Sequence, residues 1–205
     1  VVRLFEDQER KGSFKAWSLL TALSDLSSSD KKNIEQYQNI LEGPNWLDKR
    51  NEDRLYKNRE PEVIVVGSGQ AGLSIAARLK QQNIDTLIVD KNERIGDNWR
   101  NRYHSLKLHN QTHVNHLPYM PFPSTWPTYI PKDKLAGWFE YYVESMELNA
   151  WTNTKFIGAE YYENKKHWKV KLKLSDGTIK IMKPKHIVMA VGVSSVPNRT
   201  KIPGI

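Results

Sequence analysis

Residues 62–90 read EVIVVGSGQAGLSIAARLKQQNIDTLIVD, and this stretch decides the fold. The run Val63–Val66 is β-branched throughout, which is typical of a strand buried on both faces of a parallel sheet. A glycine-rich turn follows, then a helix that begins near Gln70, a stop at Asn83 and a second apolar strand, Thr86–Val89. The order strand, helix, strand predicts a βαβ unit and an α/β fold.

The turn carries three glycines at G-x-G-x-x-G spacing, Gly67, Gly69 and Gly72. The first lets the strand turn sharply, the second lets backbone approach a pyrophosphate, and the third lets helix and strand pack closely. The helix behind them directs its free N–H groups and the positive end of its dipole at the same place. This arrangement predicts a dinucleotide site that needs no lysine for the phosphates.

Asp90 ends the second strand, 23 residues after Gly67. A carboxylate in this place accepts hydrogen bonds from the ribose hydroxyls of a dinucleotide, and its charge repels a 2′-phosphate. We therefore do not expect NADP in this site. The alternative interpretation is a glycine-rich turn of an ordinary α/β domain that binds no ligand.

The composition excludes several classes of function. The 205 residues include no cysteine, which excludes disulfide redox chemistry and cysteine-based zinc sites within them. No apolar run approaches the ~20 residues of a membrane span, so we expect no transmembrane segment and a cytoplasmic protein. The net charge of +8 comes from residues 61–205, where lysines alternate with apolar residues along 168–174. This pattern is typical of the solvent face of a strand, and we predict no nucleic-acid binding.

Residues 1–60 differ from the rest in being balanced in charge. Segments 1–5 and 13–23 resemble two strands around a turn at Gly12, although 17–26 also fits a helix. Residues 31–59 resemble a polar linker, with a possible helix over 33–41. We assign residues 1–60 to the end of an N-terminal α+β domain plus linker, and residues 61–205 to a second, nucleotide-binding domain.

A long loop rich in proline, aromatic residues and histidine follows Asp90. Loops of this kind inside compact domains are usually functional. Asn98 and Trp99 follow the second strand closely enough to reach a cofactor at the sheet edge. His109, His113 and His116 also allow a metal site, but no carboxylate recurs at ligand spacing, and we predict no metal.

The remaining chain predicts one helix and a small antiparallel sheet. Residues 132–148 form an amphipathic pattern whose apolar side needs no ligand to explain it. Strands are predicted over 154–161, 168–174, 178–182 and 186–191, with a hairpin turn at Gly177. These elements predict a Rossmann-like, dinucleotide-binding three-layer α/β fold with an inserted β-meander.

Three groups of residues make the region 61–205 resemble the FAD half of the flavin-containing monooxygenases, including the plant auxin-forming branch and Baeyer–Villiger enzymes. They are the fingerprint 67–72, the block GDNWR at 96–100 with its continuation to His109, and the proline-aromatic run 117–132 followed by Ala190-Val191-Gly192 and Ile202-Pro203-Gly204. Val191 stands where the family usually has Thr. His109 followed by Asn110 departs from the Asn that many mammalian members have near the flavin.

The resemblance implies an FAD-dependent enzyme that uses NADPH, bound in a second dinucleotide fold, to insert one oxygen atom of O₂ into a small organic substrate through a flavin C4a-hydroperoxide. The resemblance assigns no catalytic residue. It does imply a set of cofactor-binding residues. These are Gly67, Gly69, Gln70, Ala71 and Gly72 for the pyrophosphate, Asp90 and Lys91 for the ribose, Ile157 for the adenine, and Asn98, Trp99, His109, His116, Ala190 and Gly192 on the flavin side.

Two other functions remain open. A flavin or NAD-linked dehydrogenase uses the same βαβ unit, although hydride transfer alone needs neither the GDNWR block nor the proline-aromatic run. A non-catalytic nucleotide-binding module is the other alternative. The chain ends where the family's NADPH domain is expected to begin, so we interpret it as a fragment that is inactive by itself. Substrate, oxygenation type and oligomeric state are not predicted.

Overall fold

The computed structural model describes residues 2–19, 43, 45–193, 202 and 204. It divides into two compact units, Val1–Asn33 and Ile34–Ile205. In the first unit, strands β1 (Val2–Glu6) and β2 (Phe14–Leu19) form an antiparallel hairpin, as predicted. The possible helix over residues 33–41 lies outside the described residues.

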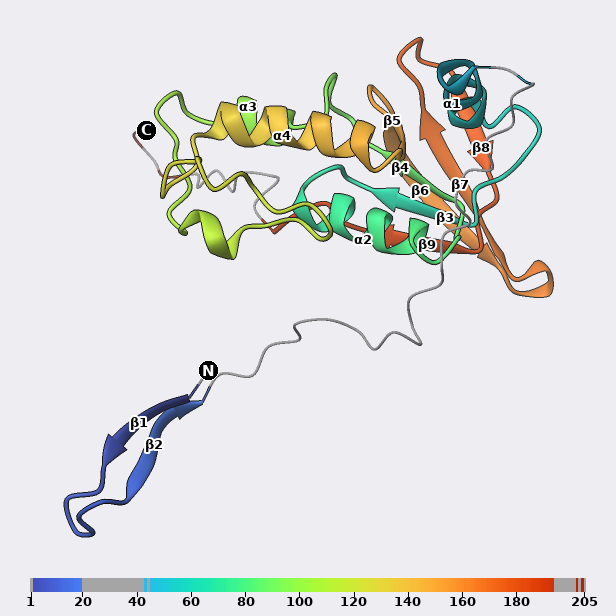
Figure 1. Ribbon diagram of the computed structural model, residues 1–205. Helices are drawn as coiled ribbons and strands as arrows, with labels where there is room; N and C mark the ends of the chain where they lie inside the picture. Colours follow the sequence, from blue (N-terminus) through green and yellow to red (C-terminus); the bar gives the residue numbers. More distant parts are fainter. Residues whose placement is uncertain (1, 20–42, 44, 194–201, 203, 205) are drawn as a thin grey trace. The chain divides into compact units, whose positions relative to one another are not determined.

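A four-stranded parallel sheet forms the centre of the second unit, in the order β5-β4-β3-β9 (Figure 1). Its strands are β3 (Val63–Val66), β4 (Thr86–Val89), β5 (Asn149–Trp151) and β9 (His186–Met189). Strand β5 pairs in parallel with β4 at the edge of the sheet. Its three residues were not predicted as a strand. The predicted βαβ unit is confirmed, because β3 and β4 pair in parallel and α2 (Gln70–Lys80) connects them.

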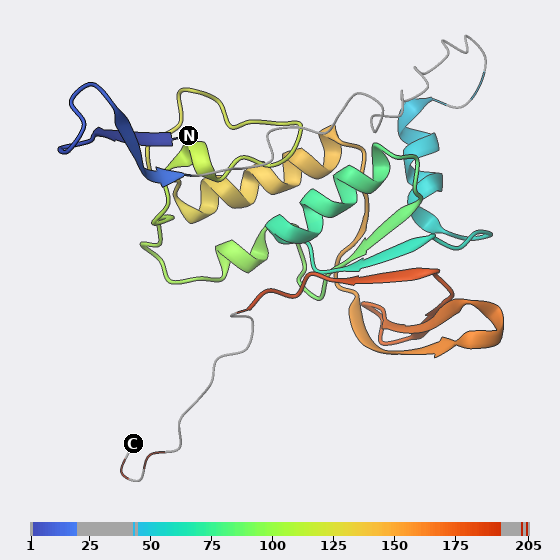
Figure 2. The same cartoon turned by 90° about the horizontal axis from the view of Figure 1, so that it is seen from below.

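The sheet is covered on both faces, as Figure 2 shows from below. Val63, Val65 and Ile88 pack with α2 and with α4 (Lys132–Ser145) on one face. Ile64 and Leu87 alternate with them and pack against the meander on the other face. Side chains alternate between faces along a strand, so the β-branched run fills two cores at once. The predicted three-layer fold is confirmed.

The meander consists of three antiparallel strands in the order β6-β7-β8. They are β6 (Lys155–Tyr162), β7 (His167–Lys173) and β8 (Ile179–Met182), within one or two residues of the predicted bounds. Val170, Leu172 and Met182 face the parallel sheet, while the lysines between them point to solvent. Short helical turns complete the unit, namely α3 (Asp97–Arg100), η2 (Thr112–Val114) and η3 (Glu163–Lys165).

Helix α1 (Trp46–Leu55) lies within the stretch that we expected to be a linker. Its first turn is capped by Asn45, whose side chain accepts hydrogen bonds from the N–H groups of Leu47 and Asp48. The helix packs beside β5, and Arg50 donates to Asn149 Oδ1 and to the carbonyl oxygen of Leu148. The assignment of residues 1–60 to a preceding domain and linker stays a prediction, but α1 belongs to the second compact unit.

No helix among residues 2–19, 45–193 and the other described positions is long and apolar enough to cross a membrane.

Candidate cofactor-binding site

The glycine turn is packed too closely for side chains at two of its three glycines. A Cβ at Gly72 would lie 1.9 Å from the carbonyl oxygen of Gly67, which brings helix α2 directly onto the end of β3. Gly67 has φ +105°, and its Cβ would lie 2.5 Å from the carbonyl oxygen of Ala190. Because Ala190 also donates its N–H to Val66, the end of β9 borders the turn. The structure thus brings Ala190 together with the fingerprint glycines.

The N-terminus of α2 is open to a ligand. Gly69 is the N-cap, no side chain caps the helix, and its first turn contains no acidic residue. Ala71 in that turn is exposed and Gln70 is half-buried. The positive end of an uncapped helix attracts anions, and phosphate groups bind there in many proteins. The residues present therefore fit a pyrophosphate.

Asp90 is held by the turn that it faces. Its Oδ2 accepts hydrogen bonds from the N–H of Ser68 at 2.8 Å and from Ser68 Oγ at 2.6 Å, and its Oδ1 accepts one from the N–H of Asn92 at 2.9 Å. The residue is only 8% exposed. A carboxylate has about four acceptor sites, so one remains for a ribose hydroxyl. The hydrogen bonds of Ser68 to Asp90 were not predicted, because the G-x-G-x-x-G fingerprint specifies only its glycines. Lys91, beside Asp90, is exposed.

Helix α3 brings Asn98 and Trp99 onto the glycine turn. Asn98 Nδ2 lies 3.2 Å from the position that a Cβ of Gly69 would occupy. The indole N–H of Trp99 donates to Gln70 Oε1 at 3.2 Å, and Trp99 packs against the core beneath α2. These two residues, predicted to lie on the flavin side, thus meet residues predicted to hold the pyrophosphate.

Other predicted residues lie elsewhere or have local partners. His116 Nδ1 accepts a hydrogen bond from the N–H of Phe122, and the two rings lie 5.3 Å apart, so this histidine is held by its own loop. His109 is exposed, and Gly192 follows β9 with φ +77°. Ile157 lies at a bulge of β6 and is 46% exposed. Within the described part of the chain, no hydrogen bond links His109, His116 or Ile157 to the turn.

No group of three or more metal-ligating side chains occurs among the residues that the structure describes. This finding includes His109, His113 and His116, which therefore do not assemble a site with acidic side chains there.

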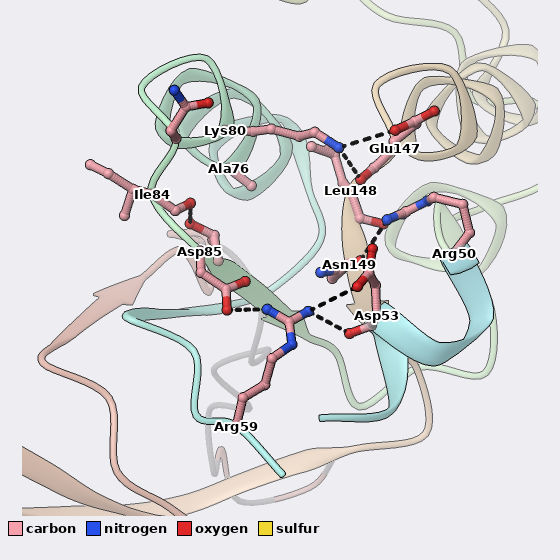
Figure 3. Close-up of a pocket in the computed structure, with 12 residues that line it drawn as sticks. Arg50, Asp53, Arg59, Ala76, Lys80, Ile84, Asp85, Glu147, Leu148 and Asn149 are labelled. Atoms are coloured by element: carbon pink, nitrogen blue, oxygen red, sulfur yellow. Dashed lines mark hydrogen bonds and ion pairs between the residues drawn. The ribbon is translucent and has the colours of Figure 1, made fainter. Parts of the chain in front are cut away.

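A separate hollow of about 360 Å³ lies at the other end of the strands, where β4 and β5 begin (Figure 3). It borders the first residues of β4 and β5, whereas the glycine turn and Asp90 follow the last residues of β3 and β4. Its charged side chains bond within the chain: Arg59 pairs with Asp85, and Lys80 donates to the carbonyl oxygen of Glu147 at 2.6 Å. Burial, followed by the nearby charge of Arg50, lowers the pKa of Lys80. Residues of α1, α2 and the starts of β4 and β5 line this hollow.

Residues 65–123 match the family model of the NAD(P)-binding Rossmann-like domain, which covers the turn, β4 and α3. A probable indole-3-pyruvate monooxygenase of Arabidopsis thaliana, YUCCA4, is 31% identical over 146 residues, or 71% of this chain. These matches support the flavin monooxygenase family for this chain. An uncharacterized CzcO-like oxidoreductase of Geobacillus kaustophilus is 42% identical over 102 residues, which are 48% of this chain and 28% of that protein.

The solved structures agree with this family assignment. The closed crystal structure of cyclohexanone monooxygenase superposes with a TM-score of 0.62 and 25% identity over 70% of this chain. The matched region is 28% of that enzyme and 34% of YUCCA4. The chain therefore spans about a third of the length of the relatives it matches.

Proposed function

We propose that this chain binds FAD, and that the protein to which it belongs is an NADPH-using monooxygenase that inserts one oxygen atom of O₂ into a small organic molecule. One observation carries the proposal: α3 places Asn98 and Trp99 directly on the uncapped glycine turn. A site for hydride transfer to a nicotinamide alone does not require that block. The relatives named as monooxygenases support the same interpretation.

The turn residues Gly67, Gly69, Gln70, Ala71 and Gly72 hold the FAD pyrophosphate in this proposal. The free N–H groups of α2 bind the phosphate oxygens, and the remaining acceptor site of Asp90 receives a ribose hydroxyl. Asn98 and Trp99 lie on the side toward the ribityl chain and the flavin. FAD held by these residues would supply the redox chemistry with NADPH and O₂.

The experiment for FAD binding compares two substitutions at one exposed position, Ala71→Glu and Ala71→Gln. The two side chains have the same size, but only the glutamate carries a negative charge at the helix N-terminus. An acidic residue there stabilises the helix by about 0.3–1 kcal/mol, so a loss of binding in Ala71→Glu does not come from loss of folding. Bound flavin is measured by absorbance after desalting and by equilibrium titration.

We expect Ala71→Gln to bind FAD nearly as well as the wild-type chain, and Ala71→Glu to bind at least about 10-fold more weakly. Two like charges about 4 Å apart near a protein surface repel by about 4 kcal/mol, which exceeds the 1.4 kcal/mol that corresponds to about 10-fold in affinity. Equal affinities in the two variants contradict the pyrophosphate assignment. A wild-type chain that binds another dinucleotide but no FAD favours the dehydrogenase or the nucleotide-binding module, and a chain that binds no nucleotide contradicts the proposed site.

Oxygenation is tested on the full-length protein with ¹⁸O₂ and NADPH in the presence of candidate amines, sulfides and ketones. Incorporation of a single ¹⁸O atom into a product supports the monooxygenase. NADPH oxidation that releases only peroxide or reduces another acceptor, with no labelled product, favours a dehydrogenase.

A further inference from the structure

Glu140 on α4 joins two arginines that flank helix α3. Its Oε1 accepts a hydrogen bond from Arg94 Nε at 3.0 Å, and its Oε2 accepts bonds from Arg94 Nη2 at 3.1 Å and Arg100 Nη2 at 2.7 Å. The Arg100 and Glu140 side chains are 19% and 34% exposed. Charge-assisted hydrogen bonds in partly buried places are stronger than ion pairs in open solvent. This carboxylate therefore binds the last residue of α3, Arg100, and the segment just before α3, at Arg94, to one point of α4.

Arg100 also binds the start of α3 and the residue before its N-cap. Its Nη1 donates to the carbonyl oxygen of Ile95 at 2.7 Å and to Asp97 Oδ1 at 3.0 Å. From the start of α4, Lys132 Nζ donates to the carbonyl oxygen of Arg100 at 2.8 Å, and Lys132 is only 7% exposed. The beginning of α3 is thus bonded to Arg100, which Glu140 of α4 binds, and its end is bonded to Lys132 of α4.

The two helices also approach closely where α3 begins. Gly96, its N-cap, has φ +89°, and a Cβ there would lie 2.6 Å from the carbonyl oxygen of Ala136 in α4. Since α3 has a single turn of four residues, it cannot be stable as an isolated helix. Its position therefore depends on tertiary contacts, namely those to α4 and those of Asn98 and Trp99 with the glycine turn and the core.

We propose that Glu140 is a positioning residue for the cofactor: through Arg100 it holds α3 so that Asn98 and Trp99 meet the glycine turn. This inference rests on the proposed function as far as the cofactor is FAD. The mechanical part, that Glu140 sets the position of α3, stands on the contacts above. Glu140 touches neither Gly69 nor Gln70 in these contacts, so its influence passes through α3.

The test compares Glu140→Gln with Glu144→Gln, which lies one turn further along the same helix. Glu144 pairs with Arg54 of α1 at 3.0 Å and its side chain is 57% exposed, so it offers the same chemical change away from α3. Two measurements are made on each chain: amide hydrogen exchange without cofactor, resolved to peptides that cover 96–103, and the FAD dissociation constant.

We expect exchange in 96–103 to become about 10-fold faster in Glu140→Gln, because the charged acceptor of a partly buried set of hydrogen bonds is lost. The FAD dissociation constant is expected to rise by about the same factor, while Glu144→Gln leaves both values within about 2-fold of wild type. Unchanged exchange in 96–103 overturns the proposal. Equally faster exchange in α2 and β3 also overturns it, since Glu140 would then serve general stability. If the wild-type chain takes up no FAD, the proposed function fails, and the exchange comparison still decides the role of Glu140.

Discussion

Replacing Gly72 by alanine tests the packing on which the glycine turn depends. The added Cβ would lie 1.9 Å from the carbonyl oxygen of Gly67 and 3.0 Å from its carbonyl carbon, both of them backbone atoms. Non-bonded heavy atoms make favourable contacts only near 3.5 Å and beyond. No side-chain rotation relieves the overlap, so α2 must move away from the end of β3.

The expected size of the effect follows from two opposing contributions. Alanine in a helix is favoured over glycine by about 1 kcal/mol, whereas overpacking costs typically about 1–3 kcal/mol and more when backbone must shift. Because backbone must shift here, we take the upper end of that cost, about 3 kcal/mol, and expect Gly72→Ala to lower the free energy of unfolding by about 2 kcal/mol. FAD binding is expected to fall more strongly, because the shift displaces the N–H groups that face the phosphates.

Gly137 in α4 offers the matched control, since a Cβ there meets nothing within 4 Å. Gly137→Ala is expected to raise the free energy of unfolding by about 0.5–1 kcal/mol through backbone entropy alone. Urea unfolding of both variants, followed by circular dichroism at constant pH, measures the difference. If Gly72→Ala is as stable as Gly137→Ala, helix and strand do not pack as closely as described, and the reasoning is refuted.

Three further predictions concern the turn, the α3–α4 contact and the core. Gly96→Ala is expected to destabilise the chain by about 1–3 kcal/mol more than Gly177→Ala in urea unfolding, because both glycines have positive φ but only Gly96 meets the backbone of α4. Ser68→Ala removes one hydrogen bond to Asp90 and should cost about 0.5–1.5 kcal/mol in thermal unfolding, while Ser68→Thr, which keeps a hydroxyl, should cost less. Burial, and then the hydrogen bond to Asp85, raise the pKa of Tyr56 above its ordinary value of 10.0, so the folded state keeps a proton that the unfolded state loses. The contribution of the Tyr56 proton to the free energy of unfolding is therefore complete below pH 10 and is lost as the pH rises above it. We expect the urea midpoint to fall less between pH 9 and 11 in Tyr56→Phe than in the wild-type chain. An equal fall in both proteins would contradict this assignment.

The sequence was sufficient for the elements with strong local patterns. The run Val63–Val66 could be assigned because four β-branched residues in succession fit a strand buried on both faces. Helix α2 could be assigned because the glycine spacing, its apolar side and the stop near Asn83, which has φ +58°, agreed with one another.

Elements whose stability comes from distant partners were missed. Strand β5 has three residues, too few for a periodic pattern, and it exists because β4 offers an edge. The pairing of Glu140 with Arg100 joins residues 40 positions apart, and no local pattern identifies it. For α1 a signal was present, since Asn45 is a favourable N-cap ahead of a helix with an acidic residue in its first turn. The predicted site residues were only partly brought together, because proline-rich loops have no period from which to place His109 or His116.

The glycine turn is held from three sides by contacts within the chain. Asp90 binds it through Ser68, Ala190 of the β9 end lies against Gly67, and α3 lies against Gly69. A site that is already ordered loses less conformational freedom on binding, which favours affinity. In the proposed function Asp90 serves two purposes, holding the turn and accepting a hydrogen bond from a ribose hydroxyl, and Asp90→Ala removes both.

Ser68→Ala separates these two purposes, because it weakens the hold and leaves the carboxylate in place. Loss of the Oγ bond also frees one acceptor site of Asp90. If Asp90 acts mainly on the ribose, Ser68→Ala retains FAD affinity within about 2-fold of wild type while losing stability. If it acts mainly by ordering the turn, affinity and stability fall together, by about 10-fold for each 1.4 kcal/mol. The ratio of these two losses therefore measures how much of the carboxylate's contribution reaches the cofactor directly and how much passes through the backbone of the turn.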